Sequence, residues 1–133
     1  MLGHIRTYMV ALIVFFSVDI LWLALVAKKL YQNKLGFIMS SKPNWWAAII
    51  FYLIFIVGLV FFVINPAQAK GSWRYALWVG MFFGFVTYAT YDLTNLATLK
   101  DWPVVITIID LIWGTALGGL VSMITFFVLD IFN

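Results

Sequence analysis

Four long apolar segments dominate the pattern of residues along the chain. They cover residues 7–27, 45–64, 73–98 and 103–132, and short polar stretches separate them. A helix needs about 20 apolar residues to cross a bilayer, so each segment is long enough. Backbone amides find no water in hydrocarbon, and a helix satisfies them within one segment. The pattern predicts an all-α fold, an integral membrane four-helix transmembrane bundle that forms a single domain over residues 1–133.

Lysines and prolines mark the expected ends of these segments. Lys28 and the lysine after it should end the first segment, because cations prefer the headgroup region. Pro66 should close the second, because proline removes a helical hydrogen bond and clashes with the preceding turn. Pro103 favours the start of the fourth, since proline suits the first turn of a helix. Residues 28–44 would then form either a short amphipathic helix in the headgroup region or an ordinary basic loop.

The composition supports a membrane protein and removes several classes of function. Hydrophobic residues make up 65% of the chain and charged residues 10%, whereas a soluble domain is about half apolar and a quarter charged. Cysteine is absent and His4 is the single histidine, so we expect neither a disulfide framework nor a metal site. No basic face remains outside the segments to bind nucleic acid. We expect membrane lipids as partners and no cofactor.

Positive charges are distributed unevenly between the two ends of the predicted bundle. The end that holds both termini would carry three cations, Arg6, Lys70 and Arg74. The opposite end would carry five, which are Lys28, Lys29, Lys34, Lys42 and Lys100. Cytoplasmic loops carry the excess of lysine and arginine in most membrane proteins. This rule predicts that the five-lysine end faces the cytoplasm and that both termini lie outside.

Three of the five aspartates fall inside the apolar segments, at Asp19, Asp92 and Asp110. A charged residue at the centre of a membrane helix costs roughly 2.5 to 3.5 kcal/mol on insertion scales, so each one needs a partner or a purpose. A rise of about 1.5 Å per residue places each about 9 to 12 Å from the five-lysine end of its segment. The spacing predicts one acidic layer in that half of the membrane.

Aromatic and amide side chains are expected in the same layer as the aspartates. Tyr88, Asp92 and Asn95 follow i, i+4, i+7 spacing, which places them on one face of a helix. A tryptophan follows both Asp19 and Asp110 by three residues, where its indole N–H can donate to a carboxylate. The predicted ligand-binding residues are Asp19, Trp22, Tyr52, Tyr88, Tyr91, Asp92, Asn95, Asp110 and Trp113.

Two further patterns concern packing rather than chemistry. Small residues recur every four positions in the third segment, at Gly80 and Gly84, and in the fourth, at Gly114, Gly118 and Ser122. Small residues allow two helix backbones to approach closely, so these rows predict contact between the two segments. Tryptophans at the segment ends are expected to form belts in the headgroup region, and they are Trp45, Trp46, Trp73 and Trp102.

Three hypotheses follow for the role of the aspartates. The first is a polar and aromatic pocket that binds a lipid or another small amphipathic molecule, with a carboxyl group that could also act as an acid, a base or a proton relay. The second is a proton-coupled carrier of small molecules, which four short helices could build as a homo-oligomer. The third is a structural partner subunit of a membrane complex, in which hydrogen bonds from Tyr, Asn, Thr and Trp hold the helices together. No recognisable catalytic motif decides whether the protein is an enzyme.

The chain contains the stretch YATYDLTNLATLKDWP at residues 88–103, followed by DLIWGT at residues 110–115. These two motifs resemble the signature of the DUF2177 family of small bacterial integral membrane proteins, and the first is the more specific. Three shorter pieces are also similar to the family pattern, namely DILWL at residues 19–23, Tyr31 with Gly36, and the pair Phe51-Tyr52. The resemblance implies a bacterial inner membrane location. It favours a role related to lipids, because such relatives are often encoded near genes for fatty-acyl modification, but it names no reaction.

Overall fold

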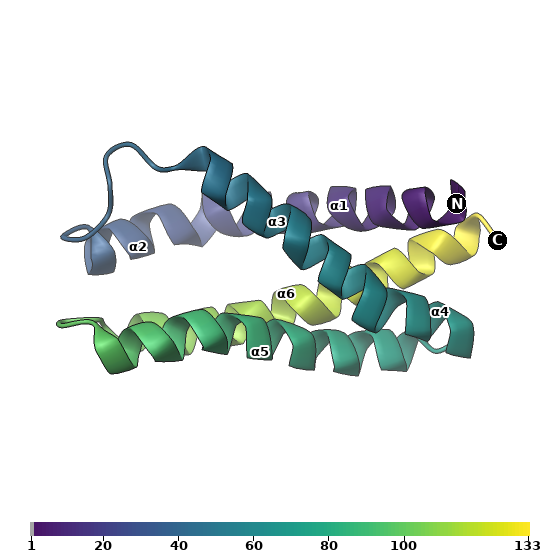
Figure 1. Ribbon diagram of the computed structural model, residues 1–133. Coiled ribbons are helices and arrows are strands. Elements are labelled where there is room, and N and C mark those ends of the chain that lie inside the picture. Colours follow the sequence, from purple (N-terminus) through teal and green to yellow (C-terminus); the bar gives the residue numbers. More distant parts are fainter. Residues whose placement is uncertain (1) are drawn as a thin grey trace.

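The computed structural model describes residues 2–133, and this part of the chain is helical with no strand. Its elements, coloured along the chain in Figure 1, are α1 (Leu2–Trp22), η1 (Leu23–Ala27), α2 (Lys28–Leu35), α3 (Trp45–Leu59), η2 (Val60–Ile64), α4 (Asn65–Lys70), α5 (Trp73–Thr98) and α6 (Val104–Ile131). The elements η1 and η2 are short π-helical stretches. The predicted all-α fold is confirmed.

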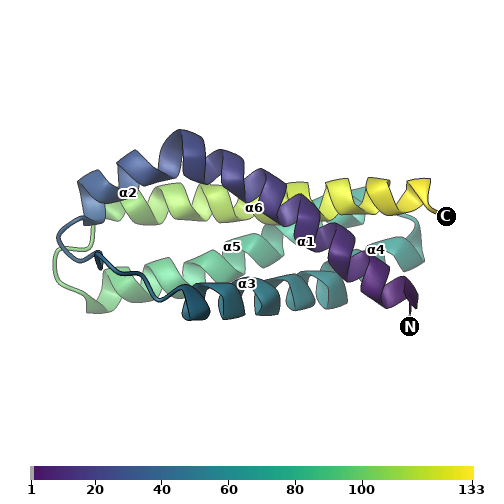
Figure 2. The same cartoon turned by 90° about the horizontal axis from the view of Figure 1, so that it is seen from above.

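These elements combine into four long helical rods. The backbone stays helical where α1, η1 and α2 join, and again where α3, η2 and α4 join. The first rod is therefore α1–η1–α2 and the second is α3–η2–α4, while α5 and α6 are rods by themselves. Figures 1 and 2 show that successive rods run in opposite directions. Both termini lie at one end, called here the terminal end, and residues 36–44 and 99–103 lie at the other, called the loop end.

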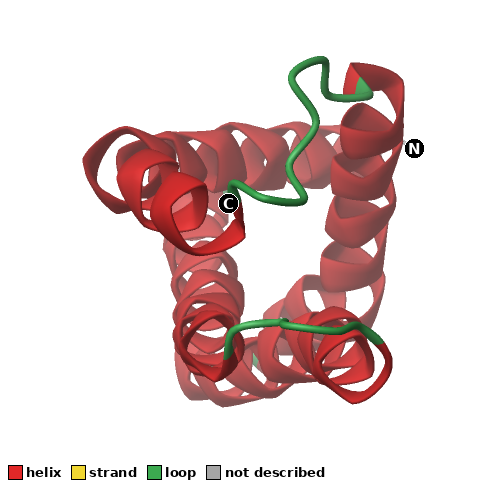
Figure 3. Ribbon diagram, turned by 90° about the vertical axis from the view of Figure 1, so that its left-hand side faces the viewer, coloured by secondary structure: helices red, strands yellow, loops and turns green. Residues whose placement is uncertain are grey.

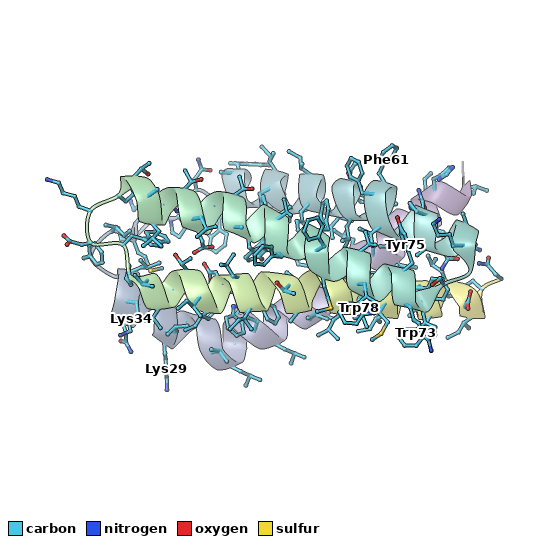
Figure 4. The ribbon with its side chains drawn as sticks, turned by 90° about the horizontal axis from the view of Figure 1, so that it is seen from below. Lys29, Lys34, Phe61, Trp73, Tyr75 and Trp78 are labelled. Atoms are coloured by element: carbon cyan, nitrogen blue, oxygen red, sulfur yellow. The ribbon has the colours of Figure 1, made fainter. Side chains whose placement is uncertain are left out.

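The rods have the length and the surface of a membrane bundle. Three of them, Leu2–Leu35, Trp45–Lys70 and Val104–Ile131, are long and apolar enough to cross a membrane. The fourth, α5, is as long but more polar, and it packs along α6. Large apolar side chains point outward along the rods, as Phe61 does in Figure 4. An apolar outer surface is what lipid contact requires, so the structure is an all-α membrane bundle of four helical rods.

The first rod continues eight residues beyond the end expected at residue 27. Residues Lys28–Leu35 form α2 in line with α1, instead of a separate in-plane helix or a loop. Lysine is a good helix former, so a pair of lysines changes the surroundings of a helix without ending it. The connection to α3 is consequently limited to residues 36–44. The rod is long enough to carry α2 beyond the hydrocarbon core.

The second rod also continues past its expected end, because the helix changes form just before Pro66. In η2 the backbone N–H of Asn65 donates to the carbonyl of Val60, five residues earlier. This wider turn gives room for a proline ring that would clash inside a regular α-helix. The rod ends six residues after η2, where Gly71 takes the left-handed conformation with φ 60° and ψ 33°. Glycine adopts this conformation at little cost, so the chain can turn there into α5.

The rows of small residues bring α5 and α6 into close contact. A Cβ atom added to Gly80 would lie 2.5 Å from the carbonyl oxygen of Gly118, and one added to Gly84 would overlap the carbonyl of Gly114. Real Cβ atoms do not approach other atoms so closely. The predicted contact between these two segments is confirmed, and it depends on the absence of side chains at the glycines.

Two of the three apolar clusters among the described residues lie on either side of the middle of the bundle, and the third is a small one that contains Ala67, Ala76 and Phe126. The larger of the first two joins α1, the second rod and α6, and includes the fully buried Phe15, Ile56 and Leu117. The other lies at the loop end and contains Leu35, Ile106 and Trp102. The expectation that Trp102 belongs to an interfacial belt is wrong, because it is 7% exposed and its indole N–H donates to Thr107 Oγ1 at 3.0 Å. The predicted belt residues Trp45, Trp46 and Trp73 are exposed.

Substituting Gly84→Ala should separate α5 from α6. We expect the free energy of unfolding to fall by about 1 to 3 kcal/mol, the usual cost of overpacking. Gly3→Ala is the matched control, because nothing lies within 4 Å of its added Cβ. Thermal unfolding in a mild detergent measures both variants. Equal stability of the two would show that the glycine contact does not hold the bundle together.

Candidate functional site

A cavity of about 360 Å³ lies between the four rods. It occupies the space between the large apolar cluster and the one at the loop end, and Figure 3 shows from the loop end how the rods surround the middle of the bundle. Its volume falls within the range typical of small-molecule pockets, roughly 300 to 1,000 Å³. Its lining residues are Asp19, Trp22, Leu23, Tyr31, Phe51, Tyr52, Thr87, Tyr88, Tyr91, Asp110 and Trp113.

The structure places most of the residues singled out from the sequence around this cavity. Seven of those nine line it, namely Asp19, Trp22, Tyr52, Tyr88, Tyr91, Asp110 and Trp113. Two do not line it. Asp92 lies buried between α5 and α6, and Asn95 is a partly buried residue one turn further toward the loop end. Residues on one face of α5 therefore have different surroundings, because Tyr88 borders the cavity while Asp92 is covered by α6.

Asp92 is fully buried, and neither carboxyl oxygen has a hydrogen-bond partner among the described residues. Its side chain lies within interaction range of Asp110, which borders the cavity. The Thr107 hydroxyl contacts the backbone carbonyl of Asp92 at 3.4 Å and does not reach the carboxyl group. Two neighbouring carboxyl groups can hold one proton between them, which avoids the repulsion of two negative charges. Asp92 is therefore placed to influence the charge of Asp110 from outside the cavity.

Tyr31 is a lining residue that the pattern of apolar segments does not indicate. Its hydroxyl donates a hydrogen bond to Asp110 Oδ1, and this bond ties α2 to α6. The sequence pattern had assigned residue 31 to the connection between two spans, outside the membrane layer. The one signal that included Tyr31 was the resemblance to the DUF2177 pattern.

The π-helical stretch η1 explains how Tyr31 reaches the cavity. Tyr31 follows Asp19 by 31 − 19 = 12 residues, and in a regular helix this spacing turns the side chain about 120° away. A π-bulge absorbs one extra residue, so Tyr31 takes the angular position of the eleventh, and eleven residues make about three full turns. Asp19 and Tyr31 consequently lie on the same face of the first rod. The bulge directly follows Trp22, another residue of the lining.

The two Asp-x-x-Trp sequences meet through their tryptophans. The rings of Trp22 and Trp113 are stacked, with centroids 4.5 Å apart and an interplanar angle of 8°. Among the described residues neither indole N–H forms the expected hydrogen bond to an aspartate; instead the Trp22 indole lies beside the Tyr31 hydroxyl. Both rings also line the cavity.

The tryptophan stack also fixes the relative depth of two aspartates. The helices that carry them run in opposite directions, and each aspartate precedes its tryptophan by three residues. Asp19 therefore lies about 4.5 Å from the stack toward the terminal end, and Asp110 lies a similar distance toward the loop end. The expectation that all three aspartates share one layer is corrected, because the first rod extends further than its sequence pattern indicated. Tyr52 lies beside Asp19 at the deeper end of the cavity.

The cavity opens sideways between α3 and α5. Three of its lining residues are exposed, Phe51 on α3 by 47%, Tyr91 on α5 by 59% and Leu23 in η1 by 48%. Figure 1 shows α3 crossing the bundle at an angle, and α5 meets the second rod mainly at η2 and α4. The start of α3 therefore stands apart from α5. In a membrane this opening faces the lipid.

The family model described as "Predicted membrane protein (DUF2177)" matches residues 4–127. The chain belongs to the DUF2177 family. The match covers nearly the whole chain and includes every residue that lines the cavity in this DUF2177 protein. The comparison with curated proteins and the comparison with solved structures each found no match. The family description identifies a membrane protein and assigns no reaction.

In this DUF2177 protein, Tyr31→Phe should weaken the attachment of α2 to α6. We expect a loss of about 1 kcal/mol in the free energy of unfolding, since the substitution removes the hydrogen bond to Asp110. Tyr75→Phe is the control, because the Tyr75 hydroxyl makes no hydrogen bond with a described residue. Denaturant unfolding in detergent should show that Tyr31→Phe costs much less when Asp110 is already alanine. An unchanged cost in that background would mean that the two side chains do not interact.

Proposed function

We propose that this DUF2177 protein binds a lipid or another small amphipathic molecule, whose polar end occupies the cavity. The observation that carries the proposal is a polar and aromatic cavity with a side opening toward the lipid. A water-soluble substrate would not need an entrance within the membrane. A lipid-like molecule reaches such an entrance by diffusing in the bilayer.

The size and chemistry of the cavity suit a polar head better than a complete lipid. Its volume of about 360 Å³ is near the lower end of the usual range for ligand pockets. The hydrocarbon part would extend through the opening beside Phe51, where it remains in contact with lipid.

The proposed roles of the lining residues follow from their positions. Asp19 would contact the polar head from the terminal-end side of the tryptophan stack, and Asp110 would contact it from the loop-end side. Tyr52 and Tyr31 would orient these two carboxyl groups, since each lies beside one of them. Asp92 would act on the site through Asp110, because it does not border the cavity. Asn95 has no direct role in this arrangement.

The proposed binding can be tested by native mass spectrometry of gently purified protein, followed by extraction and identification of the bound molecules. We expect a discrete bound molecule in the parent protein and its loss in Asp110→Asn. Asp130→Asn is the matched control, since Asp130 is exposed in the last turn of α6. Bulk phospholipid alone in all three proteins would contradict the proposal.

The proposal includes an orientation, with the loop end in the cytoplasm of a bacterial inner membrane and both termini outside. It is supported by the five lysines of the loop end against the three cations of the terminal end. The chain contains no cysteine, so a single introduced thiol reports its own side. A membrane-impermeant maleimide applied to intact cells should label Lys70→Cys and leave Lys34→Cys unlabelled. The reverse labelling pattern would invert the orientation.

A further inference from the structure

The charged groups that line the cavity all have the same sign. Asp19 and Asp110 supply carboxyl groups, and the other polar atoms belong to tyrosines, tryptophans and one threonine. No lysine, arginine or histidine occurs among the described residues of the lining. The basic side chains instead project from the outside of the bundle, as Figure 4 shows for Lys29 and Lys34. The site therefore has no positive charge of its own.

The carboxyl groups are buried deeply enough to require a partner. Asp19 is 5% exposed and Asp110 is 6% exposed. A carboxylate can accept about four hydrogen bonds, and each of these two has one tyrosine hydroxyl beside it. Buried charges are normally paired, so a group that donates hydrogen bonds and carries positive charge would complete the surroundings of Asp19 and Asp110.

The walls of the cavity are suited to the same kind of group. Seven of the eleven lining residues are aromatic, and they include the stacked pair Trp22 and Trp113. The face of an aromatic ring attracts a cation, and this attraction is strongest for tryptophan and increases when water is excluded. Aromatic rings combined with a carboxylate are the usual surroundings of a bound ammonium group. A phosphate or carboxylate head would instead meet two acids and no cation.

We infer that the molecule bound in this cavity carries an ammonium head, either a primary or a methylated amine attached to a hydrocarbon chain. This inference rests on the proposed function and specifies the chemistry of its ligand. The ammonium group lies between Asp19 and Asp110 beside Trp22 and Trp113, and the chain leaves through the opening between α3 and α5. The amine can belong to a membrane lipid headgroup or to a single-chain amine, because both present the same group.

The experiment compares probes that share one chain and differ in the head. Octylamine, octyltrimethylammonium, octanol and octanoate are added to the protein in dodecyl maltoside, whose head is uncharged. Tryptophan fluorescence and the thermal unfolding midpoint report binding. We expect both ammonium probes to raise the midpoint and to saturate at concentrations about tenfold or more below octanol, while octanoate has no effect. Phosphatidylethanolamine in mixed micelles tests the lipid source, and competition with octylamine would identify a lipid headgroup as the ligand.

Variants then connect the preference for ammonium to the cavity. Asp19→Asn and Asp110→Asn should each weaken octyltrimethylammonium binding by about tenfold or more and leave octanol binding nearly unchanged. Asp130→Asn should bind like the parent protein. Thr87→Trp, which fills the cavity, should abolish the binding of every probe. Circular dichroism and gel filtration check that each variant is folded. If an aspartate variant is not folded, the ranking of the probes on the parent protein still tests the preference for an ammonium head.

The outcomes separate the two proposals. If octanol or octanoate binds as well as the ammonium probes and Thr87→Trp removes that binding, the cavity binds a ligand but the ammonium head is wrong. If no probe distinguishes the parent protein from Thr87→Trp and native mass spectrometry finds no discrete molecule, the proposed function fails as well. Ammonium binding that is unaffected by both aspartate variants would also overturn the inference.

Discussion

The close approach of α5 and α6 is the contact on which the rest of this structure depends. At Gly80 and Gly84 the backbone of α5 lies directly against carbonyl groups of α6, a distance that no residue with a side chain allows. The same approach buries Asp92 beside Asp110 and sets Tyr88 over Gly114. In hydrocarbon no hydrophobic effect drives helices together, so close packing of this kind supplies the attraction. The packed pair of α5 and α6 forms one side of the cavity.

The other two rods complete the cavity because they do not pack against α5 and α6 along their whole length. The second rod joins the large apolar cluster near its middle, through residues such as Ile56 and Leu59, while the start of α3 stands away from α5. Trp102 and its neighbours close the loop end. The space left between these contacts collects the polar groups that lipid cannot solvate. One gap in the packing therefore provides both the shelter for the carboxyl groups and the opening toward the bilayer.

Two π-helical stretches adjust the rods where a regular helix would fail. In η2 the wider turn accommodates Pro66, so the second rod reaches its full length. In η1 one extra residue rotates α2 and carries the Tyr31 hydroxyl to Asp110. π-Bulges often occur at functional sites, because they redirect side chains at the cost of regular hydrogen bonds. Here the bulge joins the cavity to the part of the first rod that extends past the lysine pair.

The sequence by itself determined the all-α membrane fold, the approximate spans, the glycine contact and seven of the eleven residues that line the cavity. The hydrocarbon of the bilayer requires helices of a certain length and apolarity, and close helix packing requires small residues at four-residue spacing. All of these features are visible in the order of residues along the chain. Tertiary structure alone decided that Asp92 is covered while Tyr31 is included, and that α3 leaves an opening. Those outcomes depend on the rotation and crossing of helices, and one additional residue in a turn changes the rotation by about 100°. Packing between the rods sets these angles, and the local sequence pattern does not predict that packing.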